Sequence, residues 1–321
     1  MLFDKLRAAL MPGRSSGDRK VRAEMERIAL ETGAEIPMNR KFKKELVKPY
    51  RQAVQYLSGI AEAIGEPAEL DAAKWDDMPL LKALFVNPRE LTSLLATHQG
   101  LHGFFKENRS AEAYALLTAV KRTRKVVTTA EEGGIVHRDV LQENVFFEAV
   151  DLIGPSPDMD RARDGFVHHA MAAFFGLSRI EVADLKSWKK ELEEQRERLK
   201  FKIGTPARPG AESPRPPAKD EKDAEARRVL SGLVRKIEEI EQSVDSPEGH
   251  FDRLNDLLLH PERHLKAKTA YLKMGHMGSW IAARAAGPED VLAITQLESD
   301  DGPPKAAVWV RIDRAALPSP K

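Results

Sequence analysis

Apolar residues recur every three or four positions through the first third of the chain, which predicts a helical N-terminal region over residues 1–122. Asn87 and Pro88 mark one helix start, because asparagine caps free amides and proline fits the first helical turn. Pro49 falls inside another apolar repeat and predicts a kink or a helix boundary there. After Ser110 we expect one more helix, with the apolar residues Tyr114, Leu116, Leu117 and Val120.

From about residue 123 the pattern changes to β-branched and alternating positions, which predicts a β-rich segment over residues 123–157. Glycines 133 and 134 can turn the chain between two strands. Residues 246–321 predict a short helix followed by strands, the last two joined as a C-terminal β-hairpin through an Asp-Asp-Gly-Pro-Pro segment. The simplest arrangement places all these strands in one sheet.

Residues 158–245 carry two seams of apolar residues in alternating three and four spacing, with charged residues between them, as in coiled coils. The link at residues 204–223 contains five prolines and no large apolar residue, so we expect it to be disordered. The flexible tether favours an intramolecular antiparallel hairpin. Parallel homodimers and a four-helix association through the same faces remain open. The expected interface residues are Leu185, Trp188, Leu192, Leu199, Leu230, Leu233, Ile237 and Ile240.

The predicted fold class is therefore α+β and predominantly helical. An α+β body would carry an inserted antiparallel coiled-coil hairpin and a C-terminal β-hairpin. A length of 321 residues and a hydrophobic content of 42% are enough for a real core and for two ordinary domains.

Composition removes several classes of function. Lys and Arg number 51 against 50 Asp and Glu, so the net charge of +1 gives no global field toward nucleic acid or anionic lipid. The absence of cysteine excludes disulfides and thiolate chemistry and fits a cytoplasmic protein. No apolar run reaches the length of a transmembrane helix. Residues 1–11 suit a short amphipathic helix that docks on protein, with a membrane surface as the alternative.

Residues 134–147, GIVHRDVLQENVFF, resemble the catalytic loop of eukaryotic-type protein kinases in the His-Arg-Asp triplet, the four-residue gap and the following Asn. The resemblance implies that Asp139 accepts a substrate proton and that Asn144 holds a magnesium ion. No glycine-rich phosphate loop precedes this segment, and six residues after Asn144 cannot form the β-hairpin that precedes a metal-binding Asp-Phe-Gly. The alternative, which we favour, is a half-buried strand.

A second candidate site is the densest basic segment of the chain, which could contact phosphates of a nucleic acid. An ordinary solvated helix face has the same composition, and no stacking aromatic set or helix-turn-helix signature accompanies it. The candidate binding residues are Arg40, Lys41, Lys43, Lys44, Lys48 and Arg51.

Two histidine pairs, His98 with His102 and His260 with His264, have the spacing of metal ligands on a helix. Gly100 and Pro261 interrupt these pairs, and no third ligand is recognisable, so we expect solvated or capping histidines and no metal or cofactor. The leading hypothesis is a non-catalytic cytoplasmic protein that binds another protein, or itself, through its coiled-coil hairpin. A phosphotransferase using Asp139 and Asn144, and a nucleic-acid-binding protein, are the alternatives.

Overall fold

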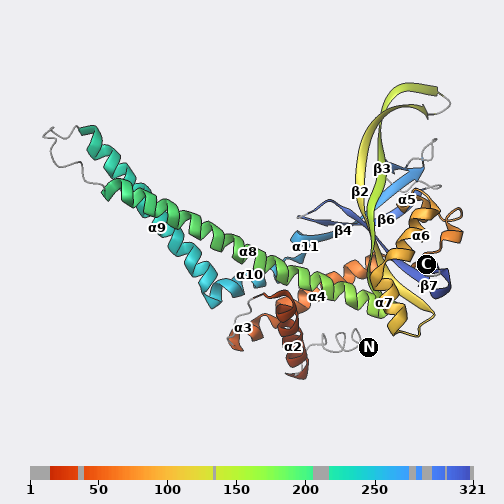
Figure 1. Ribbon diagram of the computed structural model, residues 1–321, viewed down its shortest axis with the longest axis horizontal. Coiled ribbons are helices and arrows are strands. Elements are labelled where there is room, and N and C mark those ends of the chain that lie inside the picture. The colour runs from red at the N-terminus through yellow and green to blue at the C-terminus, as the bar shows by residue number, and fades with distance from the viewer. Residues whose placement is uncertain are drawn as a thin grey trace. The chain divides into compact units, whose positions relative to one another are not determined.

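The computed structural model describes residues 15–34, 40–132, 135–204, 217–274, 280–283, 291–300 and 302–318 (Figure 1). The protein is α+β, and it divides into two compact units. The first unit contains Met1–Gly13, Gln52–Ala170 and His260–Lys321, and the second contains Arg14–Arg51 and Met171–Leu259. The amphipathic helix expected at residues 1–11 lies outside the described residues.

One mixed sheet of seven strands organises the first unit. Its strands are β1 (Ala68–Glu69), β2 (Glu112–Glu132), β3 (Ile135–Ser156), β4 (Leu265–Met274), β5 (Trp280–Ala283), β6 (Val291–Ser299) and β7 (Lys305–Asp313). The strand order is β1-β7-β2-β3-β5-β4-β6, with a further antiparallel pairing of β6 with β7. The C-terminal strands and the β2–β3 pair therefore share one sheet, as the sequence indicated.

The helix expected after Ser110 is wrong, because this segment forms the first half of β2. Strand β2 lies between β7 and β3, so both of its edges are paired, and side chains on both of its faces are buried. Leu117 belongs to one apolar core, whereas Leu116 and Val120 are buried on the other face. A strand buried on both faces shows a nearly continuous apolar run, which periodicity cannot distinguish from a buried helix. The helical region consequently ends at residue 107, well before residue 122.

Three short helices, α5 (Pro79–Leu84), α6 (Pro88–Thr97) and α7 (Gln99–Glu107), pack on one face of the sheet. The start of α6 confirms the capping prediction. The Asn87 side chain accepts hydrogen bonds from the backbone N–H groups of Arg89 and Glu90, at 3.0 and 3.1 Å. The Glu90 carboxylate in turn accepts from the Val86 N–H at 3.0 Å, so the first turn is held from both directions.

The opposite face of β7 packs on helix α4 (Val47–Ala63). Val308 and Val310 belong to the core on the α5–α7 side, so Trp309 between them points the other way. Its indole N–H donates to the Ala61 carbonyl at 2.9 Å, and its ring meets Phe166 edge-on at 6.2 Å between centroids. Helix α3 (Arg40–Glu45) ends just before α4, which confirms the boundary expected near Pro49.

The second unit is built from α2 (Ser15–Thr32), α3, the first turn of α4, most of α8 (Met159–Gly204), α9 (Pro217–Asp245) and α10 (Pro247–Leu259). Met25 and Ile28 of α2, Leu46 and Phe175 are fully buried. Helix α9 begins inside the link that was expected to be disordered up to residue 223. Pro217 suits a first helical turn, and acidic residues follow it. Residues 205–216 of that link lie outside the described residues.

Candidate protein-binding face of the α8–α9 pair

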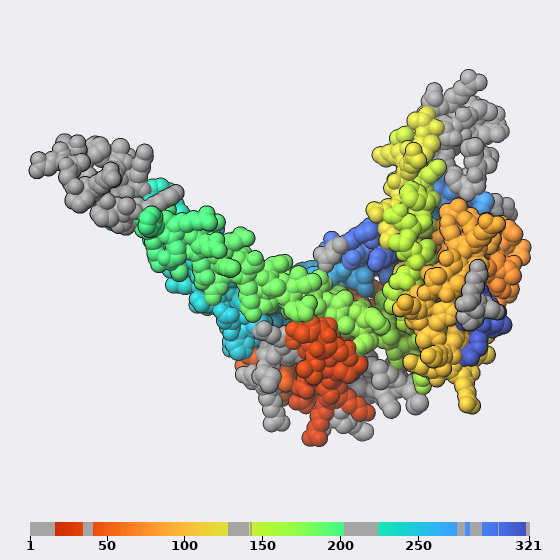
Figure 2. Space-filling model, viewed as in Figure 1, coloured from red at the N-terminus to blue at the C-terminus, as the bar shows by residue number. Residues whose placement is uncertain are grey.

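Helices α8 and α9 pack against each other through an apolar cluster of their own. Most of the residues predicted for this contact take part in it. The buried members are Val182, Leu192, Ile237, Ile240 and Val244, with Leu185 and Leu233 packed against them. Leu199 and Leu230 are half-buried farther along the two helices. In Figure 2, α8 is drawn in green and α9 in cyan.

Trp188 was predicted to lie in this contact, but it is 45% exposed and is not part of the cluster. The buried row of α8 runs from Leu185 through Lys189 to Leu192, which is the same alternating spacing displaced by one residue. The Lys189 ammonium bridges to Glu241 of α9 at 2.9 Å and to Asp245 at 3.5 Å. These ion pairs cross the helix contact and raise the pKa of Lys189, chiefly through its hydrogen bond with Glu241.

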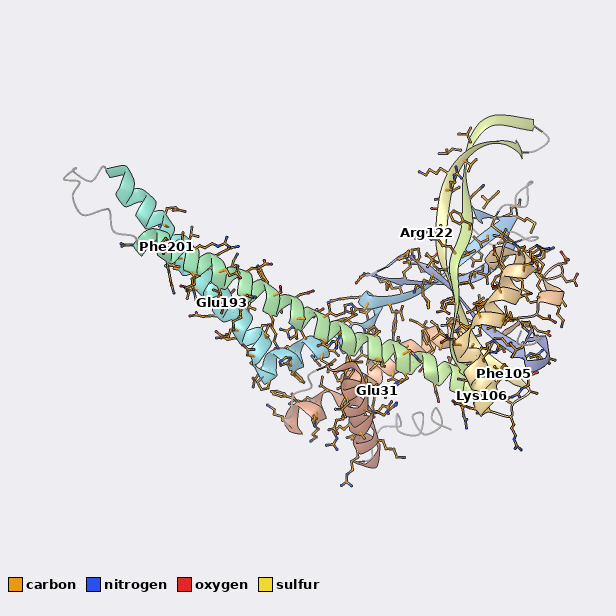
Figure 3. The ribbon with its side chains drawn as sticks, viewed as in Figure 1. Glu31, Phe105, Lys106, Arg122, Glu193 and Phe201 are labelled. Carbon is orange, nitrogen blue, oxygen red and sulfur yellow. The ribbon has the colours of Figure 1, made fainter. Side chains whose placement is uncertain are left out.

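The displacement leaves large apolar side chains on the outer surface of α8. Ile180 is 52% exposed, and Trp188 follows it two turns later along the same helix. Farther toward the end of α8, Phe201 is 77% exposed, and Figure 3 labels it together with Glu193. The α8–α9 pair therefore buries one apolar row and presents other apolar side chains to solvent.

Carboxylates surround Trp188 on α8. Glu181, Asp184 and Glu191 lie seven and four residues before it and three residues after it, so all three fall near it on the helix surface. Each is exposed, and within the described ranges none of the three has an ion-pair partner. The surface made by Ile180, Glu181, Asp184, Trp188 and Glu191 is called here the Trp188 face. It combines apolar area with unpaired negative charge. The apolar spacing of α8 does not reveal this surface, because it assigns Trp188 to the contact with α9.

The basic segment of α3 and α4 is partly neutralised. Lys43 pairs with Glu26 of α2 at 2.8 Å, and Arg51 pairs with Asp18 of α2 at 2.8 Å. Lys44 and Lys48 are exposed one helical turn apart. Lys41 is exposed, and the side chain of Arg40 is not among those that the structure describes. Acidic side chains of α2 thus pair with two of these basic residues, so fewer lysine and arginine side chains of the segment are available to bind phosphates.

The kinase-like segment lies within β3, paired with β2. His137 stands opposite Ala130, Val140 opposite Thr128 and Asn144 opposite Arg124. Asn144 lies five positions after Asp139 along an extended strand, so their Cα atoms are roughly 16 Å apart. The side chain of Asp139 lies outside the description. A strand of this length does not bring the two residues around one nucleotide, as the catalytic loop of a kinase would.

The histidines that the structure describes act mainly as local hydrogen-bonding groups. His98 caps α7 by accepting from the Leu101 N–H at 3.0 Å, and His102 bonds the Ala96 carbonyl at 2.8 Å. Over the described ranges no three His, Asp or Glu side chains are grouped so that they could hold a metal ion. None of the helices in those ranges combines the length and the apolar character of a membrane-spanning segment.

Comparison with known proteins adds no relative to this picture. The chain matches no protein-family model, no curated protein and no solved structure. The candidate site is therefore defined by its structure alone: Trp188 and Ile180 are exposed on α8 among carboxylates without ion-pair partners in the described ranges.

Proposed function

We propose that this chain is a non-catalytic cytoplasmic protein that binds another protein through α8 and α9, which act as an antiparallel coiled-coil hairpin. The observation that carries the proposal is the exposure of Trp188 and Ile180 on α8, outside the cluster that joins the two helices. Tryptophan is enriched among the residues that contribute most to protein–protein affinity. A cysteine-free composition fits a reducing compartment.

The chemistry of the Trp188 face favours a basic partner. Three carboxylates without ion-pair partners in the described ranges attract lysine and arginine side chains and steer their approach. An arginine or lysine placed over the indole of Trp188 would also gain a cation–π interaction. A helix with apolar residues on one side and basic residues beside them would satisfy both requirements.

Self-association through this face is less favourable. Two copies meeting symmetrically would bring the same carboxylates together, because a two-fold interface presents the same patch from both sides. Like charges placed across an interface oppose binding. The proposed partner is therefore a different protein and not a second copy of this chain.

A photo-crosslinking amino acid at position 188 of the full-length protein tests the proposal in cells that naturally contain it. The expected result is one dominant crosslinked species with a second protein, identified by mass spectrometry. The matched control carries the crosslinker at Lys190, which is also exposed on α8 but points away from the Trp188 face. Charge reversal of Glu181, Asp184 and Glu191 should abolish the crosslink at position 188.

Equal crosslinking from positions 188 and 190 would contradict the proposal, because it would indicate contact without a preferred face. So would a crosslink only between two copies of this chain. Circular dichroism of the charge-reversed variant shows whether its helices are intact, so that loss of the crosslink can be assigned to the surface.

A further inference from the structure

One face of the sheet in the first unit carries exposed side chains where β2, β3, β5 and β4 lie next to one another. Val145 of β3 and Trp280 of β5 belong to the core on the α5–α7 side. Their chain neighbours Asn144 and Ile281 therefore point to the opposite face of the sheet. Phe146 follows Asn144 two residues later on this face and is 46% exposed. We call this surface the Phe146 face, and its residues are Arg122, Arg124, Asn144, Phe146, Lys273 and Ile281.

Four strands each contribute one residue to a row across this face. Lys273 of β4 pairs with Ile281 of β5. Ile281 pairs in turn with Asn144 of β3, and Asn144 pairs with Arg124 of β2. Residues directly opposite each other in antiparallel strands place their side chains on the same face. Because neighbouring strands are about 4.8 Å apart, the two ends of the row, Lys273 and Arg124, are separated by roughly 14 Å.

The charge of this face is positive. Arg124 and Lys273 are exposed, and within the described ranges neither has an ion-pair partner. Arg122, which Figure 3 labels on β2, pairs with the Glu148 carboxylate of β3. Three cations against one carboxylate give the surface a local positive charge, although the net charge of the whole chain is only +1. An anionic ligand is therefore favoured here.

Asn144 adds a hydrogen-bonding group that lacks a partner. Its Oδ1 atom is buried and accepts no hydrogen bond from the described residues. A buried acceptor without a donor costs free energy, which a ligand that donates an N–H group would recover. Arg124 lies directly opposite Asn144, and Phe146 lies roughly 7 Å farther along the same strand. A cation, an acceptor and an exposed aromatic ring thus occur together on adjacent strands.

These three groups match the parts of a single-stranded nucleic acid. Its phosphates bind cations, its bases stack on aromatic side chains, and every base carries at least one N–H donor on its pairing edge. A separation of roughly 14 Å between Arg124 and Lys273 is too long for one phosphate to contact both, so a chain of several nucleotides fits better. A duplex hides its base faces and pairing edges. An acidic peptide would satisfy the cations but not the exposed ring and the acceptor.

We propose that the Phe146 face binds single-stranded nucleic acid. One base stacks on Phe146 and donates an N–H group to Asn144 Oδ1. Neighbouring phosphates contact Arg124 on one side and Lys273 on the other. This face shares no residue with the Trp188 face, so the two surfaces can be tested separately.

Fluorescence anisotropy of labelled oligonucleotides of about twelve nucleotides, titrated with the full-length protein, tests this assignment. The expected result is binding of single strands at low salt and weaker binding of a duplex of the same sequence. Two phosphate contacts predict that the logarithm of the affinity falls with the logarithm of the salt concentration with a slope of about −1.4. DNA and RNA strands of one sequence show which sugar the face prefers.

Substitutions of the ring and the cation give the sharpest comparison. Phe146→Ala should weaken binding by at least about fivefold, whereas Phe146→Tyr should retain it, because tyrosine also stacks on a base. Arg124→Ser should weaken binding and make the salt slope shallower by about 0.7. Lys125→Ser is the matched control, since Lys125 is the next residue of β2, is also exposed and points to the opposite face.

Asn144→Leu separates binding from stability. The substitution removes an acceptor that has no donor, so the melting temperature should not fall. The affinity for single strands should nevertheless fall by about three- to tenfold, because the hydrogen bond to the base is lost. A lower melting temperature with unchanged affinity would assign Asn144 to the fold alone and would refute its contact with a base.

The proposal is overturned if single strands do not bind at low salt, or if the duplex binds as tightly as the single strand. It is also overturned if Phe146→Ala binds like wild type, or if Lys125→Ser weakens binding as much as Arg124→Ser. Displacement of the oligonucleotide by polyglutamate as effectively as by an unlabelled single strand would assign the face to acidic protein segments instead.

Discussion

Two tryptophans illustrate how different environments give the same residue type different roles. Trp309 is 1% exposed, with its N–H bonded to Ala61 and its ring against Phe166. Trp188 is 45% exposed and lies outside the cluster between α8 and α9. Burial assigns Trp309 to stability, whereas exposure makes Trp188 available for binding.

We expect Trp309→Ala to lower the free energy of unfolding by about 3–5 kcal/mol, because it removes a fully buried aromatic side chain and leaves a cavity. Trp188→Ala should lower it by less than about 1 kcal/mol, since much of this side chain already contacts water. Urea unfolding of both variants, followed by circular dichroism, measures the difference. If Trp188→Ala lowered the free energy of unfolding as much as Trp309→Ala does, Trp188 would have to be buried in a core.

The cap of α6 gives a second prediction for a single residue. Asn87→Ala removes the acceptor of two backbone N–H groups and should cost about 1 kcal/mol of unfolding free energy. Asn87→Ser should retain most of the stability, because a serine hydroxyl accepts the same bonds. Equal losses for the alanine and serine variants would mean that the side chain matters for packing instead of capping.

Among the elements, the contact between α8 and α9 shows a polar residue in an apolar row. Lys189 occupies a position whose neighbours in the row are Leu185 and Leu192, and only 20% of its side chain is exposed. Its ion pairs with Glu241 and Asp245 help to determine which residues of the two helices face each other. The apolar spacing alone was equally compatible with Trp188 in this place.

Lys189→Leu should raise the melting temperature by a few degrees, because a leucine would continue the apolar row and surface-type ion pairs contribute little. Lys190→Leu, one residue farther along α8 and exposed, should not raise it. Thermal unfolding followed by circular dichroism compares the two. A lower melting temperature for Lys189→Leu would indicate that the ion pairs to α9 contribute more than the added apolar contact.

The pairing of β4 with β6 predicts a pH dependence. The Lys268 ammonium lowers the pKa of Glu298, mainly through a direct hydrogen bond. A carboxyl group with a lowered folded-state pKa stabilises the fold above its unfolded pKa of about 4.3, and this contribution is lost as the pH falls through the folded value. The melting temperature of Glu298→Gln should therefore be lower than that of wild type at pH 6, and the difference between the two melting temperatures should become smaller toward pH 3.

Salt provides the check on this assignment. The carboxylate of Glu298 is only partly buried, so added salt should reduce the gap at pH 6 by screening the charges. A gap that stays constant from pH 6 to pH 3 would show that the substitution acts through packing and not through ionisation.

For the whole molecule, two of its apolar clusters have no residue in common. The core between the sheet and α5–α7 contains no residue of α8 or α9, whereas the α8–α9 cluster contains only residues of that pair. Replacing residues 185–244 with a short Gly/Ser turn should leave the first unit folded. The same deletion should abolish co-purification of the partner that position 188 crosslinks in the full-length protein, because it removes Trp188 and Glu191.

Near-ultraviolet circular dichroism of the deletion variant reports the packing of Trp309, which should be unchanged. An unfolded deletion variant would show that the first unit depends on the α8–α9 pair. An unchanged set of interactions in cells would refute the proposed function, even if the protein folds normally.

The sequence alone determined the α+β class, the C-terminal strands, the start of α6 at Asn87 and most residues of the α8–α9 contact. These features rest on local chemistry: capping, turn residues and the spacing of apolar side chains on one helix or strand. It also gave the observation that a kinase-like triplet lacks its accompanying motifs.

Only the tertiary structure decided that residues 112–120 form a strand, because β7 and β3 cover both sides of it and outweigh its helical spacing. It likewise decided that Lys189 and not Trp188 faces α9, since acidic partners on α9 are distant in sequence. The row that ends in Arg124 and Lys273 joins residues from four strands that are far apart in the sequence. Such contacts depend on which elements meet, and no local pattern encodes that.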